Sequence, residues 1–398
     1  MAVNRVEIKN LTVFEDTAID FCEGVNVLIG ENGTGKTHLM KFIYGTLMCS
    51  YNYELLQRDK TNGTQIFDAN KLFNTTARSL MRAENIYNSI VKVKTDSSTH
   101  YNYEIDSLSS CKVFYNEGHF RFDWSFVSDP NGYGAGGAGG GAGGLDDTRA
   151  YGILPAFMLP PNAEPKGDYI LLVVPYNTKF ENNAVFIPAK DMVTHSNGFP
   201  SIARRRKREM PFDDTLLDII DTALQSNLDN IPSIALNVIP ILERSIGGKV
   251  IVENNDFYVQ KNCGNKIKFS AEAEGIKKIG LLWRLLMNES ITKDTILFWD
   301  EPEANINPKL IPVIVEILLE LSRQGVQIFA ATHDYVFSKY FEVRRKNGDL
   351  VMFHSLYEEN NDGVKCESNV NFRDLNNNPI NDSFDELMDE VIFHNVGD

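Results

Sequence analysis

Residues Gly30 to Thr37 have the types and the spacing of a phosphate-binding loop. They read Gly-Glu-Asn-Gly-Thr-Gly-Lys-Thr and match Gly-x-x-x-x-Gly-Lys-Ser/Thr at every fixed position. The glycines allow the backbone to curl so that successive N–H groups point at phosphate oxygens. Lys36 would reach the β and γ phosphates, and Thr37 would place its hydroxyl on Mg²⁺. The expected nucleotide contacts are Gly30, Asn32, Gly33, Thr34, Gly35, Lys36, Thr37 and His38.

The segments on both sides of this loop supply the frame that phosphate binding needs. Val25–Ile29 is a short β-branched apolar run that predicts a buried strand, and His38–Tyr44 predicts a helix. A helix that starts near Gly35 adds its positive dipole end to the loop. The alternative, an ordinary glycine-rich turn between a strand and a helix, is disfavoured by the full motif match and by both flanks.

Two acidic residues end an apolar strand in the last third of the chain. The run Thr295–Glu301 reads as a buried strand that closes with Asp300 and Glu301. An acid at the carboxyl end of such a strand, beside a phosphate loop, can hold the water shell of Mg²⁺, which is the role expected of Asp300. Glu301 can orient and deprotonate the attacking water. Adjacent acids at a strand end are otherwise commonly solvated, and it is the phosphate loop that favours the catalytic interpretation.

A histidine follows the next predicted strand. Asn307 can cap, and Pro308 can start, a helix that ends before Gly325. The strand Val326–Ala331 comes next and leads into Thr332-His333-Asp334. A neutral histidine at this place can donate a hydrogen bond to a γ-phosphate oxygen and report its presence. A single histidine is more often structural, but the surrounding motifs favour His333 as a site residue.

A second anion-binding helix end is predicted upstream of the acids. Phe269–Gly275 leads into a helix whose apolar positions run from Ile276 to Met287, and Ser270 is the expected N-cap. Ser270, Glu274 and Gly275 are expected to face a nucleotide held by another copy of the chain.

The remaining elements complete an α/β pattern. Antiparallel strands are expected at 5–11 and 17–21, a further strand at 101–105, and hairpins at 111–124 and 249–260. Buried strands at 169–174 and 183–187 suit a parallel sheet, and helices are expected at 214–226 and 231–246.

Composition limits the class of protein. The chain has 398 residues, a net charge of -15 and five scattered cysteines without a Cys-x-x-Cys pair, so neither a disulfide framework nor a zinc site is indicated. The net negative charge argues against a protein that binds nucleic acid over its whole surface, although it is compatible with a local basic groove. No apolar run long enough for a membrane span and no signal-peptide pattern are evident, which predicts a reduced, cytoplasmic chain without a membrane partner.

Two biased stretches interrupt the pattern. Residues 131–144 are almost only glycine and alanine after Tyr133, and a flexible loop is expected there. The run Arg204–Arg208 is the densest basic segment. It can contact nucleic-acid phosphates or an acidic partner, or it can be a solvated face that balances nearby aspartates; the solvated face is favoured because no aromatic residue interleaves the run.

The order of these motifs resembles the ABC-type ATPase heads of the RecF, SMC and OLD-like group over about 1 to 50 and 265 to 335. The resemblance implies a P-loop α/β fold with ATP and Mg²⁺ as cofactors and two heads that dimerise around ATP. It implies phosphate and metal roles for Lys36, Thr37 and Asp300. Glu301 would be the base, His333 the switch, and Ser270 with Gly275 the contacts to the other head's nucleotide. The signature Ser-Ala-Glu-Ala-Glu-Gly lacks the double glycine of ABC transporters.

The segments Phe186–Met192 and Asn378–Ile380 are also similar to the ATPase subunits of phage-defence systems such as PARIS and Septu. An ATPase core is expected at 1–50 and 265–345, with an N-terminal antiparallel β subdomain. Residues 51–264 would complete the core and add an α+β insertion or lid, and 346–398 would form a C-terminal segment. The expected function is an ATP-driven switch that oligomerises and controls a nuclease or toxin partner. A RecF-like DNA-binding repair ATPase is the alternative, and a transporter ATPase ranks last.

Overall fold

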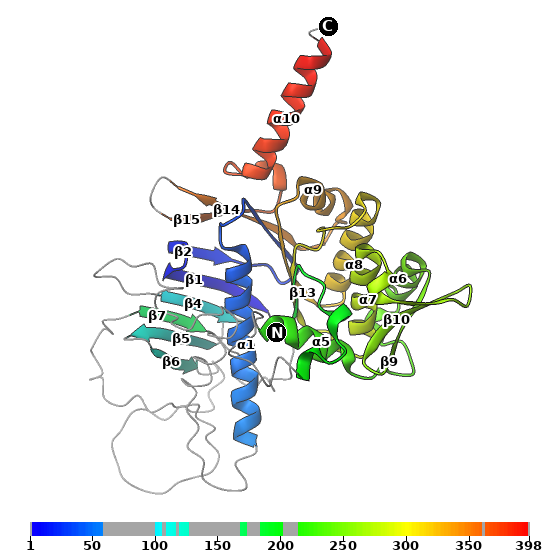
Figure 1. Ribbon diagram of the computed structural model, residues 1–398. Coiled ribbons are helices and arrows are strands. Elements are labelled where there is room, and N and C mark those ends of the chain that lie inside the picture. Colours follow the sequence, from blue (N-terminus) through cyan, green and yellow to red (C-terminus); the bar gives the residue numbers. More distant parts are fainter. Residues whose placement is uncertain are drawn as a thin grey trace, which may run out of the picture.

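A computed structural model describes most of the chain. The described residues are 2–58, 100–105, 109–116, 119–126, 168–172, 184–201, 214–359 and 363–396. The glycine-rich stretch at 131–144 and the basic run Arg204–Arg208 lie outside them. Figure 1 shows a body of helices and strands with one helix, α10 (Pro379–Val396), projecting away from it.

A six-stranded sheet forms the core of the molecule. Its order is β15 (Val364–Asn369), β14 (Val351–Glu358), β3 (Val25–Gly30), β13 (Gln327–Thr332), β12 (Ile296–Asp300) and β8 (Ala184–Ile187). Every neighbouring pair is parallel except β14 and β15, which form an antiparallel hairpin. The strands β3, β12, β13 and β8 were predicted, and their parallel pairing confirms the parallel sheet expected from fully buried apolar runs.

The core sheet extends beyond the boundary expected at residue 345. β14 pairs with β3 in parallel, with Val351 opposite Val25 and Leu356 opposite Gly30. β15 then pairs with β14. Residues 351–369 therefore belong to the core sheet, and the separate C-terminal segment is reduced to the residues after β15, chiefly α10.

A second, mixed sheet flanks the core. Its order is β2 (Phe14–Asp20), β1 (Val3–Leu11), β4 (His100–Ile105), β7 (Asp168–Leu172), β5 (Ser109–Asn116) and β6 (His119–Phe126). The expected antiparallel pair at the N-terminus is present as β1 and β2. The expectation that 169–174 joins the parallel sheet is wrong, because β7 lies between β4 and β5 in this mixed sheet. A short apolar run indicates burial, and it does not indicate which sheet provides that burial.

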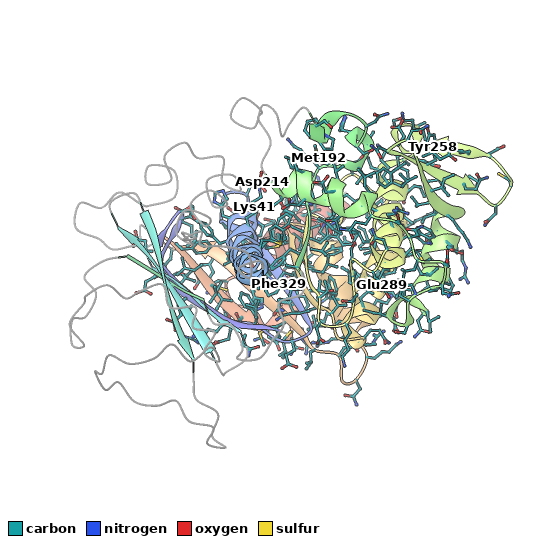
Figure 2. All side chains as sticks on the ribbon, turned by 90° about the horizontal axis from the view of Figure 1, so that it is seen from below. Lys41, Met192, Asp214, Tyr258, Glu289 and Phe329 are labelled. Carbon is teal, nitrogen blue, oxygen red and sulfur yellow. The ribbon has the colours of Figure 1, made fainter. Side chains whose placement is uncertain are left out.

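Helices cover both faces of the core sheet. They are α1 (Lys36–Arg58), α5 (Asp214–Leu224), α6 (Ile239–Ile246), α7 (Glu274–Met287), α8 (Ile311–Arg323) and α9 (Tyr335–Arg344). A small sheet of β9 (Gly248–Glu253), β10 (Asp256–Lys261) and β11 (Lys266–Lys268) packs beside α6 and α7. Seen from below, α1 with Lys41 lies between the mixed sheet and the part that carries Met192 and Tyr258 (Figure 2).

The helix expected at 231–246 is divided. A 3₁₀ turn spans Ser233–Ala235, and α6 begins only at Ile239, with Pro240 in its first turn. Within a continuous helix, the ring of Pro240 would clash with the preceding turn and its missing N–H would break one hydrogen bond. Proline is tolerated in the first turn, so the sequence restarts the helix there.

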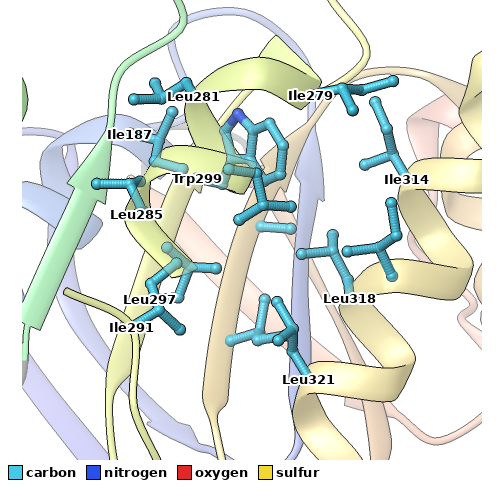
Figure 3. Packing of buried hydrophobic residues seen from close by; sticks show 14 of the residues in the cluster. Ile187, Ile279, Leu281, Leu285, Ile291, Leu297, Trp299, Ile314, Leu318 and Leu321 are labelled. Atoms are coloured by element: carbon cyan, nitrogen blue, oxygen red, sulfur yellow. The ribbon is translucent and has the colours of Figure 1, made fainter. Parts of the chain in front are cut away.

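Alternating side chains of the core strands build two apolar layers. Trp299 and Leu297 of β12 face α7 and α8, whose Leu285 and Leu318 point toward them (Figure 3). Phe298 points to the opposite face, where it stacks on Phe329 at a ring separation of 5.0 Å. Because α1 and the end of β2 cover that face, both faces of the sheet are buried, and the carboxyl ends of its strands are held rigidly at one edge.

Candidate nucleotide-binding site

The phosphate loop forms at the carboxyl end of β3. β3 ends at Gly30 and α1 begins at Lys36, which confirms the predicted strand, loop and helix. Gly30, Gly33 and Gly35 all have positive φ values, 148°, 90° and 86°. A side chain at Gly35 would also meet Val13 Cγ2 at 2.7 Å, so this position needs glycine for two reasons.

Lys36 closes the loop on itself. Its side chain is buried, and Nζ donates to the carbonyl oxygens of Gly30 at 2.8 Å and Glu31 at 2.7 Å. Burial lowers the pKa of Lys36, while the charges of Asp300, at the end of β12, and of the acids after it oppose that effect. A bound phosphate would compete with these two carbonyls for the ammonium group. Asn32, Gly33 and His38 are exposed around the loop, and Thr34 is buried within it.

Asp300 lies beside the first turn of α1. Thr37 Oγ1 is 3.0 Å from both carboxylate oxygens of Asp300, although the two residues are 263 positions apart in sequence. Asp300 is 8% exposed, and this burial, together with the charge of Glu301, raises its pKa to about 6. The structure therefore brings the two predicted metal-binding residues into direct contact.

These oxygens fit a magnesium ion. A hydroxyl and a carboxylate are hard oxygen donors, and Mg²⁺ commonly binds through one or two such side chains, with water and phosphate oxygens as its other ligands. No group of three or more acidic, histidine or cysteine side chains forms a metal cage in the part of the chain that the structure describes. The raised pKa of Asp300 marks a buried negative charge that a cation would compensate.

Glu301 adopts an unusual backbone conformation at the edge of the site. Its φ is 46°, in the left-handed region that non-glycine residues rarely adopt. Its N–H donates to the Ala331 carbonyl at 2.9 Å, and its Oε1 lies 3.4 Å from Nδ1 of His333. Both side chains are partly exposed. The structure thus places the predicted base and the predicted switch residue side by side, at the ends of β12 and β13.

Lys278 lies on α7, the helix into which the signature segment leads, and its side chain contacts the loop that begins at Glu301. Its side chain is buried, and Nζ donates to the backbone oxygens of Glu301 at 2.7 Å and Pro302 at 3.3 Å. Burial lowers the pKa of Lys278 to about 8, although the surrounding carboxylates act to raise it. The sequence did not single out this residue, since adjacent lysines on a helix give no signal of burial.

Besides Asp300, Glu303 is a second buried acid at the same edge. Thr332 Oγ1 donates to its Oε1 at 2.6 Å, while its buried Oε2 has no hydrogen-bond partner among the described residues. Burial raises the pKa of Glu303. Thr332 also accepts from the Asp334 N–H at 2.9 Å, so this cluster fixes the loop that carries His333.

The signature segment differs from the expectation in one respect. α7 begins at Glu274 with Ala273 at its N-cap, and Ser270 lies in a separate 3₁₀ turn, so Ser270 is not the cap. The extended residues Glu272 and Ala273 separate the two turns. Ser270 is exposed and Glu274 is half-buried, whereas Gly275 is buried, and a side chain there would meet Leu310 Cδ1 at 2.7 Å. Within the single chain, Gly275 allows α7 to pack closely against Leu310.

A cavity of about 450 Å³ opens next to the phosphate loop. Its lining includes Thr12, Val13, Asn32, Thr34, Tyr357 and Pro379. The loop, the β1–β2 turn, the β14–β15 hairpin and the first residue of α10 therefore meet at one hollow. A space of this size beside a phosphate loop suits the base and sugar of a nucleotide.

Two ATPase family models match the chain. One, described as "AAA ATPase domain", matches residues 1–116. The other, described as "AAA domain, putative AbiEii toxin, Type IV TA system", matches residues 171–338. The first range contains the phosphate loop, and the second contains the acids, the signature segment and His333.

A solved structure agrees with the fold over almost the whole chain. The SMC head bound to the C-winged helix domain of ScpA superimposes with a TM-score of 0.51 at 14% identity, covering 94% of this chain and 99% of that one. This chain has an ABC-type ATPase head fold.

Sequence similarity to curated proteins covers shorter stretches of this chain. The DNA replication and repair protein RecF of Bacillus cytotoxicus is 38% identical over 68 residues, 16% of this chain and 18% of RecF. The DNA double-strand break repair Rad50 ATPase of Methanopyrus kandleri is 49% identical over 41 residues, 10% of this chain and 5% of Rad50. The chain spans less than a fifth of the length of either relative. No helix among the described residues is long and apolar enough to cross a membrane.

Proposed function

We propose that the chain is a cytoplasmic ATP-hydrolysing switch that oligomerises around ATP and controls a partner effector. One observation carries the ATPase part of this proposal. Thr37 of the phosphate loop touches Asp300, and Glu301 and His333 lie together at the same edge, although three separate segments supply them. This arrangement has the parts of a phosphoryl-transfer site.

Each residue has a defined task in the proposed reaction. The loop N–H groups and Lys36 bind the β and γ phosphates, and Thr37 with Asp300 would hold Mg²⁺, which neutralises charge on the phosphates. Glu301 accepts a proton from the attacking water and aligns it. His333, in contact with Glu301, would donate a hydrogen bond to the γ-phosphate and so sense whether it is present.

The exposure of the signature segment supports a site completed by a second copy. Ser270 precedes α7 and Glu274 is its first residue, so both lie at the N-terminal end of this helix, where free backbone N–H groups and the helix dipole favour an anion. ATP held by one head would reach them on a partner head, so ATP binding would close a dimer and hydrolysis would open it.

The effector part of the proposal is supported by the comparisons with known proteins. The family model over residues 171–338 names a toxin and a toxin–antitoxin system, and the superimposed SMC head is bound to a protein domain. Together with the similarity to phage-defence ATPase subunits, these support a nuclease or toxin partner and an antiviral role. The partner would respond to the open and closed states of the heads.

ATP hydrolysis by a Glu301→Gln variant tests the site. Phosphate release should fall by about 10² to 10⁴ fold while ATP still binds, because only the proton acceptor is lost. Glu23→Gln is the matched control, because Glu23 is an acid just before the opposite end of β3. Equal phosphate release by the Glu301→Gln and control variants would remove Glu301 from the reaction.

The RecF similarity favours a second candidate function, a DNA-binding repair ATPase. In that case duplex DNA ends should stimulate ATP hydrolysis, with a steep dependence on salt concentration. The switch proposal predicts hydrolysis that is unchanged by DNA. The basic run Arg204–Arg208, which would carry such contacts, lies outside the described residues.

A further inference from the structure

The loop that follows β12 contains two strained residues. Glu301 and Asn305 both have left-handed backbone conformations, with φ values of 46° and 60°. Non-glycine residues keep such conformations where the surrounding contacts enforce them. The start of the loop is held by the backbone of Glu301, whose N–H donates to the Ala331 carbonyl and whose carbonyl accepts from Lys278. The middle of the loop is held separately, by the side chain of Glu303.

The carboxylate of Glu303 joins this loop to the end of β13. Glu303 is 9% exposed, and Thr332, the last residue of β13, is fully buried. Thr332 Oγ1 donates to Glu303 Oε1 at 2.6 Å, although the two residues are 29 positions apart in sequence. The other carboxylate oxygen, Oε2, is buried and has no hydrogen-bond partner among the described residues. A buried carboxylate with an unpaired oxygen is unfavourable for folding, which indicates a functional reason for its contact with Thr332.

The same hydroxyl group fixes the residue after His333. Thr332 Oγ1 accepts from the Asp334 N–H at 2.9 Å, and the carboxylate of Asp334 caps the N-terminus of α9. His333 therefore lies between two anchored residues, and its Nδ1 is 3.4 Å from Glu301 Oε1. The hydrogen bond between Glu303 and Thr332 thus connects the segment that carries Glu301 with the segment that carries His333.

We propose that Glu303 is a positioning residue for ATP hydrolysis, which holds the Glu301 carboxylate in place relative to His333 through its hydrogen bond with Thr332. This inference rests on the proposed ATPase function. A general base must lie within hydrogen-bond distance of the attacking water, and a misplacement of about 1 Å can lower the rate roughly a hundredfold. Without the bond to Thr332, the strained loop would relax and Glu301 would leave its position.

The charge of Glu303 offers a second route by which this residue could affect the reaction. Among the carboxylates that oppose the lowering of the pKa of Lys278, Glu303 has the largest effect. The ammonium group of Lys278, however, donates to the backbone oxygens of Glu301 and Pro302. The hydrogen-bond route and the charge route predict different results when Thr332 is changed as well, because only the first needs the threonine hydroxyl.

The test is a double-mutant cycle on the full chain, measured by ATP hydrolysis. Glu303→Ala and Thr332→Val should each lower kcat by about tenfold to a hundredfold and leave KM for ATP within about threefold. The double variant should lose at most about threefold more than the weaker single variant, because both substitutions remove the same bond. Thr332→Ser keeps the hydroxyl and should retain kcat within about threefold. Losses that multiply in the double variant, or an unchanged kcat for Glu303→Ala, would overturn the proposal.

Asp349→Ala is the matched control for a purely structural role. The Asp349 side chain is 7% exposed and accepts from Arg323 at 2.6 Å. Asp349 precedes β14, whose first residue pairs with the first residue of β3, so it lies at the sheet edge opposite the phosphate loop. The substitution should lower the urea midpoint of unfolding, as Glu303→Ala does, but keep kcat within about threefold. Equal losses of kcat by both variants would reduce Glu303 to a contributor to stability.

A measurement without hydrolysis separates this inference from the proposed function. The ring nitrogen NMR signals of His333, assigned with His333→Asn, should shift in Glu303→Ala and Thr332→Val, because these variants release the segment that contacts Glu301. The signals should not shift in Asp349→Ala. Unchanged His333 signals in the first two variants would overturn the positioning role, whether or not ATP is hydrolysed. The expected shifts in a protein that does not hydrolyse ATP would contradict the ATPase function and leave the hydrogen-bonded connection in place.

Discussion

At the scale of single residues, the site buries the carboxyl group of Asp300 where a metal ion is expected, and this burial disfavours its charged form. Asp300 is buried beside Thr37, and Glu301 follows it directly, so the pKa of Asp300 rises to about 6 from an ordinary value of 3.8. Glu301 itself holds a left-handed backbone conformation. Strain and unpaired charge of this kind persist where a ligand relieves them, which agrees with a nucleotide and metal site.

Asp300→Asn should stabilise the nucleotide-free protein in a pH-dependent way. Between about pH 4 and pH 6, folded Asp300 holds a proton that the unfolded chain has released, so wild-type unfolding free energy falls as pH rises through this window. The unfolding free energy of Asp300→Asn does not fall in this window, because asparagine does not titrate. Its advantage should grow from near zero below pH 4 to about 1 to 3 kcal/mol at pH 7. Urea unfolding at several pH values measures it, and an advantage that is constant with pH would contradict the assignment.

The motif residues were predictable because their spacing carries the chemistry. The loop from Gly30 to Thr37 and the acids after β12 were located from the sequence, and the structure brings them together as expected. Lys278 and Glu303 were not identified. Their role depends on how α7 and the β13 loop approach β12, and no local pattern encodes that approach.

At the scale of elements, the side chain of Lys278 ties α7 to the loop that carries Glu301. Lys278 donates to the backbone oxygens of Glu301 and Pro302, so a movement of α7 would be transmitted to Glu301, the proposed base. Lys278→Met should lower kcat by about tenfold to a hundredfold and leave KM for ATP within about threefold, because it disturbs the position of Glu301 without touching the phosphate loop.

Lys277→Met is the matched control for this prediction. Lys277 is buried to a similar degree, but its ammonium pairs with Glu274 at 2.6 Å and Asp191 at 3.5 Å. The Lys277→Met substitution should therefore leave kcat nearly unchanged in the isolated head. If both variants lose kcat equally, Lys278 acts only through the stability of α7.

Gln327 links the mixed sheet to the core sheet. Its buried amide accepts from the Val3 N–H at 2.7 Å and donates to the carbonyls of Val3 and Cys22, each at 2.8 Å. Gln327→Leu leaves these backbone groups without partners and should cost about 2 to 4 kcal/mol of unfolding free energy. The control is Gln324→Leu. Gln324 is half-buried, and its side-chain amide makes one 3.4 Å contact with Glu320. This substitution should lower the free energy of unfolding by less than about 1 kcal/mol.

At the scale of the whole molecule, the sequence predicted the class of fold better than its boundaries. The parallel core was foreseen from apolar runs such as Val25–Ile29, which are buried on both faces. The place of β14 and β15 in that sheet was not foreseen, because pairing with β3 is a contact between residues more than 300 positions apart. The assignment of β7 to the mixed sheet depends on the same kind of distant contact.

The central claim is that ATP closes two heads, and the mass of the Glu301→Gln variant tests it most directly. Light scattering with Mg²⁺ should give 44.9 kDa without nucleotide and twice that value with ATP, because the variant holds ATP without hydrolysing it. A mass that is the same with and without ATP would contradict the switch, even if the site residues bind nucleotide as described.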